Sequence, residues 1–148
     1  MTAPELKLED FLPYRLSVLS NQVSQGISET YAKRFGLSVT EWRVVAILGR
    51  FPDIPATQIV EYSAMDKVAI SRAVRRLLEA GLVKRQRDTS DKRAKLLTLS
   101  AQGHEVYSTI APAALAYEQQ LLSVLSTSEQ EVLRSLLDKL ENVSRPAR

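Results

Sequence analysis

Residues 66–103 read DKVAISRAVRRLLEAGLVKRQRDTSDKRAKLLTLSAQG, and this stretch decides the fold predicted for the 148-residue chain. Its first part has the period of an amphipathic helix, which Asp66 can cap and which Gly81 ends after Ala80. At about 100° per residue, the apolar side chains share one arc and the polar ones the opposite arc. The apolar set is Ile70, Val74, Leu77 and Leu78, and the polar set is Ser71, Arg72, Arg75, Arg76 and Glu79.

The second part changes to the alternating pattern of strands. Residues 82–87 and 94–99 alternate and are separated by the polar turn 88–92, so we expect a β-hairpin. A short helix that starts at Pro55 precedes the 66–80 helix after only a brief turn, which makes the pair a helix-turn-helix candidate. A hairpin directly after a helix-turn-helix is a wing.

The flanking segments predict further helices. Asp10 can cap a first helix, whose apolar stripe runs from Leu12 to Tyr31. Ser38 and Glu41 form a capping box for a helix that ends before Phe51, and we expect Val39, Trp42, Val45 and Ala46 to face inward. Ser100 begins a fifth helix, with a bend expected near Pro112, and Ser126 begins a sixth with an apolar stripe over 133–140. The fold class is therefore mainly α with a small β-hairpin.

The terminal helices each carry a single apolar stripe that needs a partner. The two ends can cover each other within one chain, or they can pair across a two-fold axis, as in most soluble oligomers. The stripes alone leave both arrangements open.

Composition excludes several classes of protein. With 45% hydrophobic and 25% charged residues, we expect a folded, soluble chain. No apolar run approaches the ~18 residues of a membrane span, and the N-terminus is acidic where a signal peptide is basic, so we expect a cytoplasmic protein. The chain has no cysteine, His104 is its only histidine, and its five glycines form no phosphate loop. We therefore expect no enzyme, no metal and no cofactor, and we interpret His104 as a surface or capping residue.

Positive charge gathers in the middle of the chain. Residues 66–95 hold ten Lys or Arg against four acidic residues, a net charge of +6, whereas the rest of the chain carries −3. Such a block is the footprint of a phosphate-binding face, although charge alone fits a solvated surface equally well. A helical protein-interaction module without a nucleic-acid role remains an alternative, but it leaves the basic hairpin unexplained.

Double-stranded DNA is the partner that fits these residues best. A recognition helix reads base edges from its N-terminal half, and the narrow basic hairpin can reach an adjacent minor groove. Asp91 is spaced to hold the Arg93 guanidinium in a fixed pose. The predicted base readers are Lys67, Val68, Ala69, Ser71 and Arg72; Arg75 and Arg76 lie nearer the phosphates; and the hairpin supplies Lys84, Arg85, Arg87, Lys92 and Arg93.

These motifs together resemble the MarR family of bacterial regulators (multiple antibiotic resistance regulator type). The family's wing pattern is matched by Gly81-Leu82-Val83, Arg85, Asp91-x-Arg93 and the segment from Leu99 to Gly103, with Ser100 where the family often has Thr. Tyr14-Arg15-Leu16 and Glu41-Trp42-Arg43 are similar to a proteobacterial branch of the family. The resemblance covers nearly the whole chain.

The resemblance implies a winged helix-turn-helix lobe over about residues 36–100, with dimerisation helices over about 10–35 and 101–145. It implies a homodimer that binds a pseudo-palindromic operator, usually as a repressor, and that a small ligand releases. Arg93 would enter the minor groove, braced by Asp91. Members that sense oxidants need a cysteine, which this chain lacks, so an aromatic carboxylate or phenol is the expected effector. We place Tyr14, Arg15 and Trp42 near it, although a single Trp at helical spacing is more often part of a core.

Overall fold

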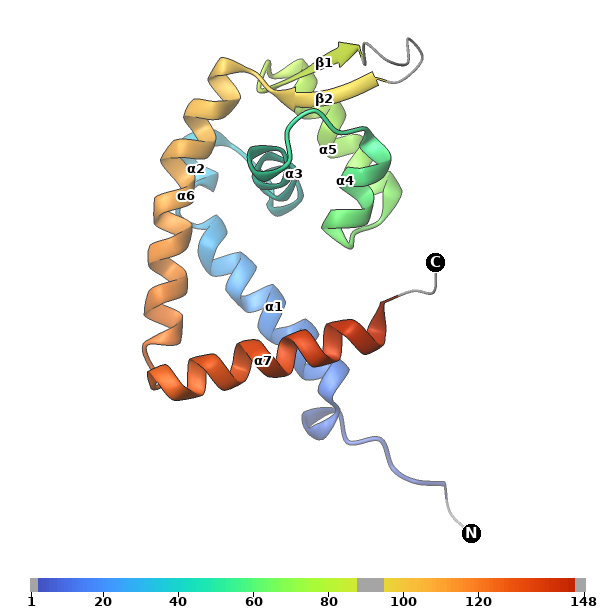
Figure 1. Ribbon diagram of the computed structural model, residues 1–148, viewed down its shortest axis with the longest axis vertical. Coiled ribbons are helices and arrows are strands. Elements are labelled where there is room, and N and C mark those ends of the chain that lie inside the picture. Colours follow the sequence, from blue (N-terminus) through green and yellow to red (C-terminus); the bar gives the residue numbers. More distant parts are fainter. Residues whose placement is uncertain (1–2, 88–94, 146–148) are drawn as a thin grey trace. The chain divides into compact units, whose positions relative to one another are not determined.

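The computed structural model describes residues 3–87 and 95–145 (Figure 1). It is mainly helical with a two-strand antiparallel sheet, as the sequence predicted. In chain order the elements are η1 (Leu8–Asp10), α1 (Leu12–Ser28), α2 (Ala32–Phe35), α3 (Val39–Arg50), α4 (Ala56–Ser63), α5 (Lys67–Glu79), β1 (Val83–Arg87), β2 (Lys95–Leu99), α6 (Ala101–Leu122) and α7 (Thr127–Ser144). No helix in the described ranges is long and apolar enough to cross a membrane.

The chain divides into two compact units, Met1–Ala114 and Leu115–Arg148. The first unit contains the hydrophobic core, to which α3, α4, α5, both strands and the first half of α6 contribute. Its most deeply buried side chains are Tyr31, Val44, Val45, Leu48, Ile59, Ile70, Leu77 and Ile110. In Figure 1, α3, α4 and α5 gather beside the sheet.

Helix α3 begins at the predicted capping box. The Ser38 hydroxyl accepts a hydrogen bond from the Glu41 amide (3.1 Å), and the Glu41 carboxylate accepts one from the Ser38 amide (3.1 Å). Of the inward residues predicted for this helix, only Val45 is fully buried, and Trp42 is half-buried. The buried face also includes Val44 and Leu48, because α3 packs against α4, α5 and β2 on different sides.

The start of α1 differs from the prediction. Asp10 does not cap this helix; it ends the short helix η1, and Phe11 occupies the N-cap position without a side-chain hydrogen bond. The Phe11 carbonyl accepts the first helical bond, from the Arg15 amide at 3.1 Å. The apolar stripe also outlasts the helix, because α1 ends at Ser28 and Tyr31 belongs to the turn before α2.

A set of backbone bonds fixes the base of the hairpin. Gly81 adopts a positive φ of 77°, which lets the Leu82 amide donate to the Leu77 carbonyl (3.0 Å) and ends α5. The Ser100 hydroxyl donates to the Gly81 carbonyl (2.6 Å) and accepts from the Gly103 amide (3.0 Å). One serine therefore caps α6 and ties it to the end of α5.

The strands pair in register from Val83 with Leu99 to Arg87 with Lys95. Ile54, in the loop between α3 and α4, adds a bridge to Leu97 through two backbone bonds of 3.2 and 2.8 Å. The hairpin is therefore held at its base by α5, by α6 and by this loop.

The second unit consists of the end of α6 and α7. Helix α6 continues through Pro112 without interruption. Ser126 and Glu129 form the predicted capping box of α7, with bonds of 2.9 and 3.1 Å. The Gln130 side-chain amide donates to the carbonyls of Leu122 and Leu125 and closes the turn between the helices. No residue of α7 is buried, so its apolar stripe lies open within this unit.

The close approach of Gly103 to the hairpin base gives a stability test. A Cβ at this position would collide with the Leu82 carbonyl oxygen and crowd the Leu99 side chain. Gly103→Ala should therefore lower the free energy of unfolding by roughly 1–3 kcal/mol, although the same change at an open helical position raises it. Chemical denaturation measures the effect, with Gln102→Ala on the exposed side as control. An unchanged or raised midpoint for Gly103→Ala would contradict this packing.

Candidate nucleic-acid interface

Helix α5 presents one face to the core and the other to solvent. Ile70, Ala73, Val74 and Leu77 are buried. The Asp66 carboxylate accepts a hydrogen bond from the Ala69 amide at 3.2 Å, which confirms the predicted cap. The exposed residues are Lys67, Val68, Ser71, Arg72, Arg75, Arg76 and Glu79. The division predicted from helical periodicity is therefore present in the structure.

The turn between α4 and α5 sets the direction of α5. Helix α4 ends at Ser63, and Ala64 takes a positive φ of 52°. The buried Ser63 hydroxyl donates to the Val60 carbonyl (2.9 Å) and accepts from the Met65 amide (3.1 Å). The Arg43 guanidinium of α3 donates to the Ser63 carbonyl at 3.3 Å. Ser63 thus joins α3, the end of α4 and the turn that leads into α5.

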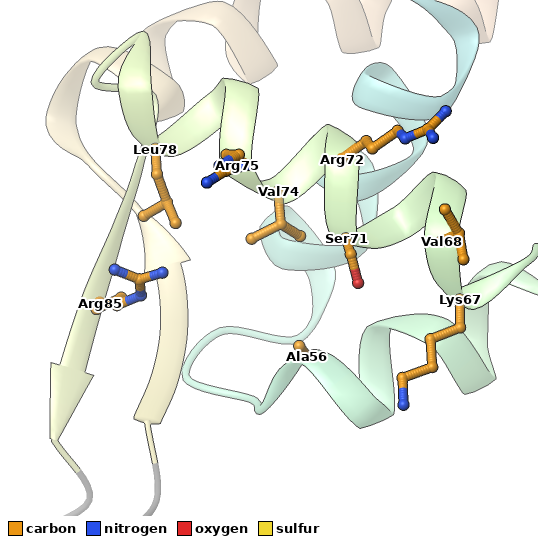
Figure 2. Close-up of a pocket in the computed structure, with 9 residues that line it drawn as sticks. All are labelled: Ala56, Lys67, Val68, Ser71, Arg72, Val74, Arg75, Leu78 and Arg85. Atoms are coloured by element: carbon orange, nitrogen blue, oxygen red, sulfur yellow. The ribbon is translucent and has the colours of Figure 1, made fainter.

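A groove of about 680 Å³ lies along the exposed side of α5. Figure 2 shows its lining side chains, which come from α5, from the start of α4 and from β1. Four of the five predicted base readers, Lys67, Val68, Ser71 and Arg72, line it together with Arg75 and with Arg85 of β1, which were also predicted to bind DNA. Ala56, Val74 and Leu78 complete the lining. Residues of the helix and of the hairpin therefore line one concave surface, although Ser71 and Arg85 are 14 residues apart in the sequence.

A smaller hollow of about 200 Å³ lies between α5 and the start of α3. It is lined on the α5 side by Ala69, Arg72, Ala73 and Arg76, and on the other side by Ser38, Thr40 and Glu41. Arg72 lines both hollows, and in Figure 2 its side chain leaves α5 on a different side from Ser71. Ala69 is half-buried, so it is less open to a partner than its four predicted neighbours.

The exposed arginines of α5 are weakly neutralised. The Arg75 Nε lies 4.0 Å from a Glu79 carboxylate oxygen, and both side chains are more than 70% exposed. Such a pair contributes little in water, because solvent screens it. The charge of Arg75 remains available to an anionic partner.

The hairpin residues are only partly described. Arg85 is exposed on β1 and joins the groove, and Arg87 belongs to the same strand. Asp91, Lys92 and Arg93 lie outside the described residues. Ala56, at the start of α4, was not predicted, because its place in the groove depends on how α4 packs against α5 and no local sequence signal marks it.

The predicted effector residues do not meet within one chain. Tyr14 and Arg15 line an open groove of about 500 Å³ along α1, together with Leu12, Leu16, Val18, Leu19 and Gln22. Trp42 instead lies between Tyr31 and Tyr107, with ring-centroid distances of 5.7 and 6.1 Å. Tyr31 follows the opposite end of α1, and about 20 Å of helix separates that end from Arg15. One small ligand cannot touch Arg15 and Trp42 of the same protomer.

Among the described residues, the phenol of Tyr31 is a titratable group whose environment the fold changes. Burial raises its pKa above the ordinary value for a phenol, the nearby Arg43 charge lowers the pKa, and the Glu41 carboxylate raises it. Tyr31 therefore stays neutral at any physiological pH. It contacts Trp42 as an uncharged side chain in the ring column, the row of aromatic rings formed by Tyr31, Trp42 and Tyr107.

Known proteins match this geometry. The family model described as "MarR family" matches residues 35–94, which contain α3, α4, α5 and the first strand, β1. A crystal structure of a MarR/EmrR family transcriptional regulator from Acinetobacter sp. ADP1 superposes with a TM-score of 0.84, at 29% identity over 93% of this chain and 96% of that one. The chain belongs to the MarR family.

Two further relatives extend the match. A probable transcriptional regulator from Pseudomonas aeruginosa is 33% identical over 90% of this chain and 99% of its own, with a TM-score of 0.72. Transcriptional regulator HosA of Escherichia coli is 27% identical over 106 residues, which are 72% of this chain and 78% of HosA. This MarR-family chain is a DNA-binding transcriptional regulator with a winged helix-turn-helix, and the prediction that it is not an enzyme is confirmed.

The hydroxyl of Ser63 gives a test of how the site is held. Ser63→Ala leaves the Met65 amide without its acceptor at a position that is 3% exposed. Removal should lower the free energy of unfolding by about 1–3 kcal/mol. Thr57→Ala, an exposed hydroxyl of the same helix, is the matched control and should change stability little. Equal denaturation midpoints for Ser63→Ala and wild type would show that the turn does not depend on this hydroxyl.

Proposed function

We propose that this MarR-family chain is a ligand-controlled repressor, which binds a pseudo-palindromic operator as a homodimer through the groove beside α5. The observation that supports this most strongly is the position of four cations, Lys67, Arg72, Arg75 and Arg85, around one concave surface at the exposed side of a helix. A helix that enters the major groove places such side chains against base edges and flanking phosphates. A mutant MarR from Escherichia coli has been solved with operator DNA, and it shares this fold at 22% identity with a TM-score of 0.76.

The roles divide by position along α5 and the hairpin. The N-terminal residues Lys67, Val68, Ser71 and Arg72 read bases, with Ala69 beside them, because this end of a recognition helix lies deepest in the groove. Arg75, Arg76 and Arg85 lie farther along and bind phosphates. Arg87, Asp91, Lys92 and Arg93 form the part of the wing that reaches the next minor groove, where Asp91 braces Arg93.

Exposed apolar side chains support a homodimer. Helix α1 exposes Leu12, Tyr14, Leu16 and Leu19, and α7 exposes Val132, Leu133, Leu136, Leu137 and Leu140, all at 38% or more. Two such stripes on a soluble chain are unfavourable in water and are covered when a second copy packs on them. A two-fold dimer also presents two α5 helices, which accounts for the symmetry proposed for the operator.

The open groove at Tyr14 and Arg15 fits an aromatic carboxylate. Apolar residues line most of it, and Arg15 supplies a planar donor for a bidentate pair with a carboxylate. Trp42 can join them on the same ligand only as Trp42 of the partner subunit. Relatives with the same fold bind aromatic compounds: CouR from Rhodococcus jostii RHA1 was solved with p-coumaroyl-CoA, and the DNA binding of BpsR from Bordetella bronchiseptica is regulated by 6-hydroxynicotinic acid.

Reading and anchoring should separate by mutation. Arg72→Ala should relax base preference and cost about 1–3 kcal/mol of binding free energy, whereas Lys92→Ala should weaken all duplexes alike. Arg93→Ala should lower affinity most, and Asp91→Ala should cause part of the same loss. Selection from random duplexes followed by titration measures both, with Arg134→Ala of α7 as control. An equal loss on all sequences for Arg72→Ala and Lys92→Ala would refute the assignment, and binding that does not weaken with added salt would refute the phosphate-binding face.

The assembly is tested by sedimentation. At micromolar concentration we expect twice the chain mass of 16.5 kDa. Leu136→Asp places a charge in the apolar stripe of α7 and should shift the protein toward monomer, whereas Asn142→Asp adds the same charge on the other side of the helix and should leave the dimer intact. A folded wild-type monomer at this concentration contradicts the proposed assembly.

Effector control is tested with benzoates, hydroxycinnamates and salicylate-like acids. A ligand that weakens operator binding tenfold prefers the DNA-incompetent dimer by about 1.4 kcal/mol, and operator DNA must weaken ligand binding by the same factor. Calorimetry with and without DNA measures this reciprocity. Arg15→Ala should lose the response and keep operator affinity. An Arg15→Ala variant that responds like wild type would move the effector site elsewhere.

A further inference from the structure

Val68 is an exposed apolar side chain on the cationic face of α5, near the start of the helix. It lies nine residues before Leu77, so at about 100° per residue the two point in opposite directions from the helix. Leu77 is 1% exposed and Val68 is 55% exposed. Single exposed apolar residues are common on protein surfaces, so the exposure of Val68 alone does not indicate a binding role. Its position indicates one, because Val68 is the second residue of α5 and lies where the helix would approach DNA most closely.

The neighbours of Val68 make this spot a contact for a base. In Figure 2, Lys67 and Val68 lie side by side at the start of α5, and Ser71 follows one turn later. Lys67, Ser71 and Arg72 supply hydrogen-bond donors, which suit the oxygen and nitrogen atoms of base edges. The two methyl groups of Val68 offer none. A polar base edge pressed against them would lose its water without gaining a hydrogen bond, which is unfavourable.

One group in the major groove suits an apolar side chain: the C5 methyl of thymine, which marks an A·T pair and its orientation. Resting on the DNA interface proposed above, we infer that Val68 determines specificity by packing on a thymine methyl in each half-site. The valine thus discriminates thymine from cytosine by an apolar contact, while the arginines beside it hold the duplex in register.

The test removes the methyl group from the DNA and its contact from the protein. The probe is a synthetic duplex carrying the sequence selected by the wild-type protein from a random pool, with each thymine of a half-site replaced in turn by uracil. Uracil keeps every hydrogen-bonding group and lacks only the methyl. At one position the wild type should lose about four-fold in affinity, the factor that burial of one methyl group provides.

Val68→Ala should bind the parent duplex more weakly and should lose its sensitivity to uracil at that position. Alanine favours helix at this exposed site, so the variant folds. The matched control is Arg75→Ala, which removes a proposed phosphate contact from the same groove and should weaken all duplexes while it keeps the four-fold effect of uracil. Val68→Ile retains an apolar contact with the methyl group and should keep the four-fold effect of uracil as well.

The outcomes separate the two proposals. If no duplex is selected from the random pool, the proposed DNA interface fails and this inference fails with it. If a duplex is selected but its half-site has no fixed thymine, or no thymine is sensitive to loss of its methyl, the role of Val68 is overturned and the DNA interface stands. The same holds if Val68→Ala retains the full wild-type sensitivity.

Discussion

The packing of one face of α5 into the core is the constraint on which the site depends. Ile70, Ala73, Val74 and Leu77 are buried against α3, α4 and the hairpin. A helix held this way cannot rotate about its axis without exposing these side chains, at a cost of about 25 cal/mol per Å² of apolar surface. The opposite face is therefore fixed toward solvent, and the direction of its arginines follows from the position of its leucine and isoleucine.

Two junctions convert this fixed rotation into a surface. Ser63 joins α3, α4 and the turn that leads into α5 through three hydrogen bonds, and Ser100 joins the end of α5 to α6 and the hairpin. Each junction satisfies backbone groups that helix ends would otherwise leave unpaired. Helix α5 is therefore held at both ends. The groove that contains Arg72 and Arg85 is lined by residues of α4, α5 and β1, which lie apart in the sequence.

Local signals in the sequence predicted most of these elements. The capping boxes at Ser38 and Ser126, the Asp66 cap and the stop at Gly81 each involve residues within three or four positions, so neighbours along the chain determine them. Asp10 does not cap α1 because it belongs to the short helix η1 instead.

The sequence predicted most of the residues that line the groove but not the groove itself. Ala56, for example, lines it only because of how α4 packs against α5. Trp42 was placed with Arg15 by resemblance, whereas the ring column with Tyr31 and Tyr107 depends on contacts across 65 residues, between Trp42 and Tyr107, that no local pattern contains.

The central claim is that the exposed face of α5 contacts DNA. Amide chemical shifts of the isotopically labelled protein, followed while an operator duplex is added, test it directly. The largest changes should fall on Lys67, Val68, Ser71 and Arg72 and on Arg85 of β1, with small changes along α7. Large changes on the apolar stripes of α1 and α7, with the α5 amides unmoved, would contradict it.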